Sequence, residues 1–300
     1  MPGPVTAGQF FPNYLWRPHE PNRSRSGVRG QSFHLDGALL MNSRTFAACT
    51  IAAALSAALP ATSFAGCEAQ SGPKTAALVE LYTSEGCSDC PAADQQLSRL
   101  RQALDPSAKV VPLALHVDYW DYIGWKDPYA QAAFGERQSW LVRTNLHKTV
   151  YTPQFFVGGT ELRPWQGGLR DQVRRLNAVP AEAAIRVQAG LAATGALALS
   201  AEAKASAATA PVALYLAITE SGLVSKVTRG ENGGVTLAHD HVVREWIGPI
   251  RLIGDTAQAQ REITLPPAWN RAQLEVVAFV QNERTGSVLQ AVSARMCAAS

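Results

Sequence analysis

The chain has 300 residues, of which 47% are hydrophobic and 17% are charged, and its formal net charge is +3. These proportions are typical of a folded globular protein and exclude a chain that is disordered over most of its length. Five of the 27 basic and two of the 24 acidic residues lie within residues 1–65, so the remaining segment carries 22 of each and has no net charge. This balance gives no reason to expect a nucleic-acid partner.

The N-terminal segment differs from the rest of the chain. Residues 1–40 contain five prolines and four arginines without periodicity, which predicts a disordered extension or one that lies upstream of a true start at Met41. Residues 41–65 then carry Arg44, an alanine-rich apolar run and the small residues Ser63 and Ala65, which are the parts of a secretory signal peptide. The alternative is a buried alanine-rich helix. We expect a periplasmic or secreted protein with no stable membrane span after signal removal.

Four cysteines remain after removal of such a signal: Cys67, Cys87, Cys90 and Cys297. An even number of cysteines in an exported protein favours disulfide pairing. Cys87 and Cys90 are partners by spacing. For Cys67 and Cys297, near the two ends of the mature chain, we expect a structural disulfide, with two free thiols as the alternative. No cysteine–histidine spacing resembles a zinc site, and we expect no metal and no other cofactor.

The next segment, residues 74–180, shows an α/β pattern. We expect a buried strand at residues 76–82, the dithiol at 87–90 and a helix at 91–100. A second strand at 109–117 and a helical insert at 127–148 follow. Two strands joined at a Gly-Gly turn then cover residues 152–163, and a closing helix covers 169–176. Pro91 suits the first turn of its helix, where a missing N–H does no harm.

From residue 184 to residue 297 the pattern changes to short runs with a strand period, separated by turn residues. Residues 274–280 and 288–292 form a convincing terminal hairpin, and residues 230–234 form a turn. This half predicts a small antiparallel β-sandwich domain.

The Cys87-Ser88-Asp89-Cys90 dithiol is the strongest chemical feature of the sequence. A thiol at a helix N-terminus faces free N–H groups and the positive end of the helix dipole, which stabilise the thiolate that attacks disulfides. Cys87 is therefore the expected nucleophile, and Cys90 the more buried resolving thiol. The negative charges of Asp89 and Glu85 oppose thiolate formation and predict a relatively reducing couple.

The motifs resemble those of the thioredoxin and glutaredoxin superfamily. From Val79 onward the chain is similar to an uncharacterised bacterial family of predicted secreted proteins with a thioredoxin-like domain. Three segments carry this similarity: residues 80–94, His116-Val117-Asp118-Tyr119-Trp120-Asp121, and Arg229-Gly230-Glu231-Asn232-Gly233-Gly234. The chain departs from thioredoxin in its Ser-Asp spacer, in Gly86 before the dithiol and in the helical insert.

The resemblance implies a cis-proline at Pro153 that packs beside the dithiol, with Thr152, Gln154 and Trp120 along a substrate path. His116 and Asp118 alternate at the end of a strand and share one face, so they form a candidate proton relay, with a polar strand end as the equal alternative.

Two imidazoles in His239-Asp240-His241 share one strand face and form a candidate metal pair, but a solvated strand edge is the better interpretation. The sequence as a whole predicts an exported thiol–disulfide oxidoreductase whose partner is a thiol- or disulfide-bearing protein or glutathione. The alternatives are a non-catalytic secreted binding protein with a structural disulfide, and a Cu(I) carrier.

Overall fold

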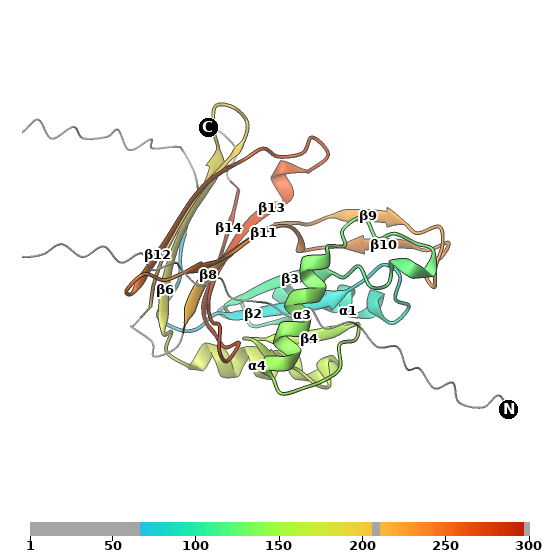
Figure 1. Cartoon of the computed structure of the whole chain (residues 1–300), viewed down its shortest axis with the longest axis horizontal. Coiled ribbons are helices and arrows are strands. Elements are labelled where there is room, and N and C mark those ends of the chain that lie inside the picture. Colours follow the sequence, from blue (N-terminus) through green and yellow to red (C-terminus); the bar gives the residue numbers. More distant parts are fainter. Residues whose placement is uncertain (1–66, 206–210, 297–300) are drawn as a thin grey trace, which may run out of the picture. The chain divides into compact units, whose positions relative to one another are not determined.

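Within residues 67–205 and 211–296, which the computed structural model describes, the strands form three sheets and the helices lie against the largest of them (Figure 1). The strands are β1 (Cys67–Gln70), β2 (Ala77–Thr83), β3 (Val110–His116), β4 (Gln154–Val157), β5 (Thr160–Glu161), β6 (Ala183–Leu191), β7 (Leu197–Ala205), β8 (Val212–Glu220), β9 (Leu223–Lys226), β10 (Thr236–His239), β11 (Val242–Arg251), β12 (Thr256–Ile263), β13 (Leu274–Asn282) and β14 (Val288–Arg295). The helices are α1 (Cys90–Ser98), α2 (Leu100–Ala103), α3 (Ala132–Thr144) and α4 (Trp165–Ala178), with 3-10 turns at η1 (Asp121–Ile123) and η2 (Arg271–Gln273). None of the helices in this described part is long and apolar enough to cross a membrane.

The largest sheet has eight strands in the order β14-β13-β8-β11-β3-β2-β4-β5. Strand β2 pairs in parallel with β3 and antiparallel with β4, and β4 pairs antiparallel with β5. Every residue of β2 is buried. A continuous apolar run is what a strand covered on both faces requires, and this explains why Ala77-Leu78-Val79 shows no alternation.

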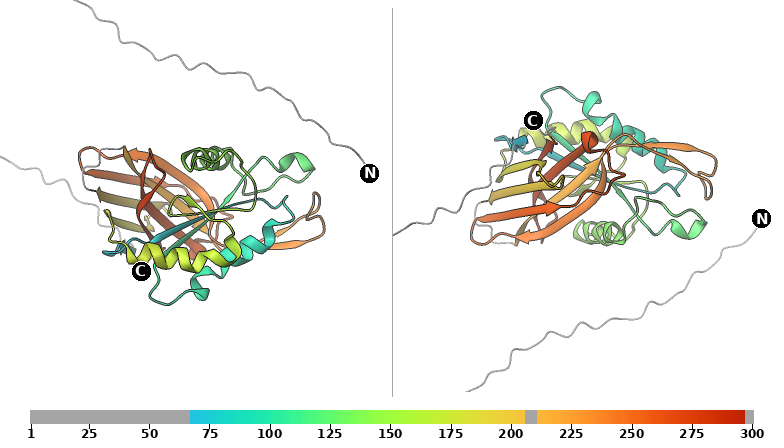
Figure 2. Two further views of the ribbon diagram at one scale, coloured as in Figure 1. Left: turned by 90° about the horizontal axis from the view of Figure 1, so that it is seen from below. Right: turned by 90° about the horizontal axis from the view of Figure 1, so that it is seen from above.

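Helices cover both faces of the β3-β2-β4 part of the sheet (Figure 2). Leu97 of α1 and Val173 of α4 pack with Val79 and Leu81 on one face. On the other face Phe134 and Leu141 of α3 pack with Leu78 and Tyr82, among others. The dithiol at the start of α1 is thereby fixed to a strand in the middle of the sheet.

A four-stranded sheet, in the order β1-β6-β7-β12, packs against the other half of the large sheet. Alternation along β8 divides its side chains between two cores. Leu214 and Leu216 face the four-stranded sheet, whereas Ala213 and Tyr215 face the α3 side. The inner face of this four-stranded sheet is rich in alanine, including Ala189, Ala201, Ala203 and Ala259.

The two segments predicted as separate domains share this sheet. Strand β11 lies next to β3 in parallel register, with Val242 opposite Ala114, and the Ala114 N–H donates to the His241 carbonyl at 2.8 Å. At the other end, the Val288 N–H donates to the Gly158 carbonyl at 3.1 Å. The boundary expected between residues 180 and 184 therefore does not divide the structure, whose described residues belong to one compact unit.

Candidate functional site

Cys87 and Cys90 form a disulfide where the chain passes from β2 into α1, with their Cα atoms 5.4 Å apart. The pairing expected from the spacing is confirmed. Pro91 occupies the first turn of α1, as predicted, and Asp89 is the N-cap residue without a capping side-chain hydrogen bond. Ser88 and Asp89 are exposed, but Cys87 is only 2% exposed and Cys90 is fully buried. The two residues between the cysteines are therefore at the surface, whereas the disulfide itself is almost completely buried.

Trp120 connects the dithiol loop to the proline loop. A Cβ atom on Gly86 would lie 3.2 Å from the Trp120 Cβ, so the aromatic loop packs directly on the residue before Cys87. The Trp120 indole N–H donates to the Thr152 hydroxyl oxygen at 2.7 Å. The Thr152–Pro153 bond is cis, as expected, and Pro153 is buried. Trp120, Thr152 and Pro153, which were predicted to line the substrate path or to flank the dithiol, are thus connected by this hydrogen bond and by the peptide bond.

Gln154, also placed on the substrate path, does not face that path. Its side chain is fully buried, accepts a hydrogen bond from Gln138 at 2.7 Å and donates one to Glu161 at 2.8 Å. Gln154 is the first residue of β4 and lies opposite Tyr82 in β2, so it holds the proline loop to the sheet from inside. Its role in the fold is structural.

The turn at residues 230–234 covers the dithiol loop, a contact that no sequence pattern predicts. The Asn232 side-chain amide donates to the carbonyl oxygens of Glu85 at 2.8 Å and of Cys87 at 3.0 Å. The Ser88 N–H donates to a carboxylate oxygen of Glu231 at 3.0 Å, and this contact lowers the pKa of Glu231. We call residues 229–234 the covering loop. This loop is one of the three segments that carry the family resemblance, but no pattern in the sequence predicts that it contacts the dithiol loop.

A buried ion pair lies next to the dithiol loop. His116, at the end of β3, is opposite Thr83 of β2 and is 2.7 Å from Asp127, and both side chains are fully buried. Asp127 also accepts the Glu85 N–H at 2.8 Å. Burial alone would lower the pKa of His116, but the charge of Asp127 and the hydrogen bond to it raise that pKa. Burial would raise the pKa of Asp127, but the charge of His116 and the hydrogen bond to it lower that pKa.

Asp118 is not the partner of His116, and that part of the predicted relay is wrong. Strand β3 ends at His116, so the alternation that would place both residues on one face stops before Asp118. The Asp118 carboxylate lies 3.7 Å from the position that a Cβ on Gly135 would take, beside α3. Asp127, eleven residues from His116, takes its place.

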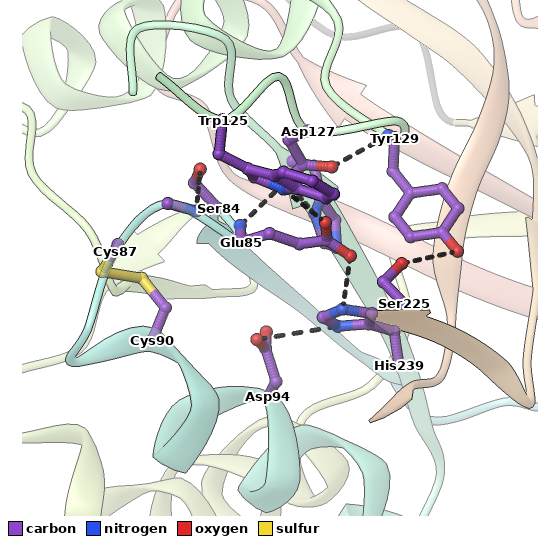
Figure 3. A network of polar contacts seen from close by, with 12 residues as sticks. Ser84, Glu85, Cys87, Cys90, Asp94, Trp125, Asp127, Tyr129, Ser225 and His239 are labelled. Atoms are coloured by element: carbon purple, nitrogen blue, oxygen red, sulfur yellow. Dashed lines mark hydrogen bonds and ion pairs between the residues drawn. A yellow bond between two sulfur atoms is a disulfide. The ribbon is translucent and has the colours of Figure 1, made fainter. Parts of the chain in front are cut away.

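A second buried cluster joins the dithiol loop to the β9–β10 hairpin (Figure 3). His239 lies 3.0 Å from Glu85, and the Trp125 indole N–H donates to the other carboxylate oxygen of Glu85 at 2.8 Å. On its other side His239 faces Asp94 of α1, at 3.8 Å. The rings of His239 and His116 meet edge to face at 5.0 Å between centroids. Glu85 is therefore directed into this cluster.

The interpretation of His239 and His241 as a solvated strand edge is wrong, because both are buried, at 2% and 8% exposure. They also do not share a strand, since β10 ends at His239 and β11 begins at Val242. In the described part of the chain no group of three or more His, Cys, Asp or Glu residues is arranged to hold a metal ion.

Three other predictions concern residues outside the described part. The signal peptide at residues 41–65, the extension at residues 1–40 and Cys297 all lie there. The expected pairing of Cys67 with Cys297 remains a prediction. Cys67 itself begins β1 at the edge of the four-stranded sheet, opposite Ala189 of β6.

The fold and the site define a strand-rich, mixed α/β protein with a covered disulfide at the start of a helix and buried acid–imidazole pairs beside it. The chain belongs to the family described as "Protein of unknown function (DUF1223)", whose model matches residues 78–281. No protein among the curated sequences matches it.

Two solved structures are similar to this chain. HBP35 of Porphyromonas gingivalis has a TM-score of 0.58 and 17% sequence identity, with 75% of this chain and 76% of that chain covered. Protein AGR_C_4864 from Agrobacterium tumefaciens has a TM-score of 0.53 and 21% identity, with 74% of this chain and 95% of that chain covered. At these identities the similarity concerns the fold alone.

Proposed function

We propose that this protein is an exported thiol–disulfide oxidoreductase in which Cys87 and Cys90 form the redox couple. The observation that carries the proposal is the Cys87–Cys90 disulfide at the N-terminus of α1, directly after a central strand. A thiolate of Cys87 in that position would be stabilised by the positive end of the α1 dipole. The segment from β2 to α4 would then be a thioredoxin-like unit, and its β3-β2-β4-β5 strand order supports this interpretation.

The proline loop supports the same proposal. Trp120 holds Thr152 next to the dithiol loop through its indole N–H. In this proposal the backbone of Thr152, before Pro153, pairs with an extended segment of a partner. The fitting partner is a protein disulfide, or a small thiol such as glutathione.

Exchange at this site requires the covering loop to move. Cys87 is 2% exposed, and an incoming thiolate must reach its sulfur in line with the disulfide bond. The β9–β10 hairpin that carries the loop is a two-stranded sheet that pairs with no other strand of residues 67–205 and 211–296. Among the described residues, Asn232 and Glu231 form the hydrogen bonds from the loop to the dithiol loop. Because these few hydrogen bonds hold the covering loop, it can move while His239 of β10 stays buried against Glu85.

The test is catalysed reduction of a protein disulfide by dithiothreitol. The wild-type protein should accelerate the reaction, Cys87→Ser should abolish the acceleration, and Asn232→Ala should increase it by loosening the cover. A wild-type rate equal to the protein-free background, with Asn232→Ala equally inactive, would refute the proposed function.

A second function, in which the dithiol is only a structural disulfide of a secreted binding protein, is favoured by the burial of both cysteines. That function predicts that the bond resists mild reductant in the folded protein, and that Asn232→Ala changes nothing. The same experiment therefore separates the two.

A further inference from the structure

Strand β10 has one edge that no other strand of the described residues covers. On its other edge it pairs with β9, and the same register includes the Val227 N–H, which donates to the Val235 carbonyl at 3.0 Å. Hydrogen-bonded and non-hydrogen-bonded residues alternate along an antiparallel pair, so Leu237 bonds to β9 and its two neighbours do not. The N–H and C=O groups of Thr236 and Ala238 therefore point to the uncovered edge.

An open groove of about 560 Å³ follows this edge, with β10 on one side and α1 on the other. Figure 1 shows β10 as the strand of the hairpin that lies toward α1. Every residue from Val235 to Asp240 lines the groove, whereas a groove over one face of a strand would be lined by alternate residues. The groove therefore runs along the edge of β10. Its volume lies within the range of about 300–1,000 Å³ that is typical of ligand sites.

The two walls of the groove match the length of an extended peptide. Residues 235–240 extend over about 16 Å at the rise of a strand. The opposite wall runs from Pro91 to Gln102, which is also about 16 Å at the rise of a helix. Between these ends Gln95 and Ser98 line the groove with an amide and a hydroxyl group, both of which hydrogen-bond to peptide groups. An extended segment of about five residues fits this space.

The uncovered edge is held in place, although β9 and β10 form only a small sheet. Leu237 is 6% exposed, and His239 is 2% exposed and lies 3.0 Å from Glu85. On β9 the Ser225 hydroxyl donates to the Tyr129 hydroxyl oxygen at 3.3 Å. A strand edge that is already ordered costs a ligand less free energy on binding than a loop that must first be ordered.

We propose that this groove binds an extended segment of an unfolded or flexible protein chain, which adds to the edge of β10 as a third strand. Main-chain groups at strand spacing, such as those of Thr236 and Ala238, are complementary to another main chain. Recognition through the main chain tolerates many side-chain sequences. Pro91, the residue after Cys90, lines the groove, so a bound chain passes next to the dithiol. That this chain is the exchange partner rests on the proposed function, whereas the pairing itself does not.

The test is binding of an unfolded chain that cannot take part in thiol–disulfide exchange. The probe is ribonuclease A that has been reduced, carboxamidomethylated and labelled with a fluorophore, and fluorescence anisotropy gives its Kd for the oxidised protein. Ala238→Pro removes one N–H from the uncovered edge and places a ring in the path of the added strand. This variant should bind the probe about tenfold more weakly or worse.

Val224→Pro is the matched control. Val224 lies opposite Ala238 on β9, so its N–H points to the far edge of the hairpin, away from the groove. Both substitutions remove an N–H that the β9–β10 pairing does not use, and far-UV circular dichroism shows whether each variant is folded. Val224→Pro should bind the probe as the wild type does. Equal affinities of the two variants would overturn the proposal.

Amide hydrogen exchange of the wild type tests the same site without a substitution. The probe should slow exchange of the Thr236 and Ala238 N–H groups about tenfold or more and leave that of Val224 unchanged. No slowing at Thr236 and Ala238 would overturn the proposal. Protection of these amides before the probe is added would overturn it too: protection that grows with protein concentration would assign the edge to a second copy, and constant protection to the chain itself.

The outcomes for the groove and for the exchange function are separate. Binding at β10 without any acceleration of disulfide reduction would refute the exchange function and leave the peptide site standing. Acceleration by a protein whose β10 amides never respond to the probe would refute the peptide site alone.

Discussion

Arg137 of α3 provides a quantitative test of how the two halves of the fold are joined. Its side chain is 7% exposed and donates to Glu80 of β2 at 2.7 Å and to Gln281 of β13 at 3.0 Å. The guanidinium also lies 4.6 Å from the Trp246 ring centroid and 5.2 Å from that of Phe279. Replacing Arg137 by Met keeps the apolar packing but leaves the carboxylate of Glu80 buried without its cation. Loss of one partner of a buried ion pair costs about 3–5 kcal/mol.

The double variant Arg137→Met with Glu80→Gln removes the uncompensated charge as well. It should be more stable than Arg137→Met alone, although it carries one more change, because a neutral buried amide costs only about 1–3 kcal/mol. Urea unfolding of the oxidised protein, followed by tryptophan fluorescence and by far-UV circular dichroism, measures both variants. Coincident transitions are expected, because Glu80 and Gln281 belong to the two segments that share one sheet. A loss below about 1 kcal/mol in the single variant, or a double variant that is less stable still, would refute the reasoning.

Three further predictions concern charge. Glu231→Gln keeps a hydrogen-bond acceptor for Ser88 but removes a negative charge at the start of α1, so the Cys87 thiolate should be stabilised and the reduction potential should become more positive; an unchanged glutathione equilibrium would contradict this. The pKa of His116 is raised, so its contribution to stability is lost as pH rises above about 6.5. The pKa of Asp127 is lowered, so its contribution is lost as pH falls below about 4. Asp127→Asn should therefore lower the free energy of unfolding most near about pH 5–6 and less at about pH 8. Burial lowers the pKa of His241 to about 4, so this residue destabilises the folded state as pH falls from 6.5 to 4, by about 3 kcal/mol, and His241→Gln should remove that loss in urea unfolding at pH 4.5 compared with pH 7.

Features with a local signal could be predicted from the sequence. The apolar run before the dithiol gave β2 within one residue, and Pro91 marked the first turn of α1. The spacing of Cys87 and Cys90 gave their disulfide, because two intervening residues allow the sulfurs to meet within one turn. Helix α3 begins later than expected, at Ala132, because Asp127 is used as a partner of His116 and not as part of a helix.

The partners of the dithiol loop could not be predicted, because they come from distant segments. Asn232 is 145 residues from Cys87, and His239 is 154 residues from Glu85. The sequence alternation that makes β9 and β10 a hairpin says nothing about where that hairpin packs.

The parallel pairing of β11 with β3 could not be predicted from the sequence either. It rests on one register pair, Val242 with Ala114, and both strands show only the apolar character of buried strands in general. The change from an α/β pattern to strand runs near residue 184 therefore predicts a domain boundary, although β8, β11, β13 and β14 extend the same sheet.

Capture of a mixed disulfide tests most directly whether Cys87 is a reactive nucleophile. Cys90→Ser, incubated with glutathione disulfide, should accumulate a glutathione adduct that peptide mass spectrometry locates on Cys87, whereas the wild type should resolve it into the Cys87–Cys90 disulfide. An unmodified Cys87 in folded Cys90→Ser, under conditions that modify the same thiol after unfolding in urea, would contradict the account.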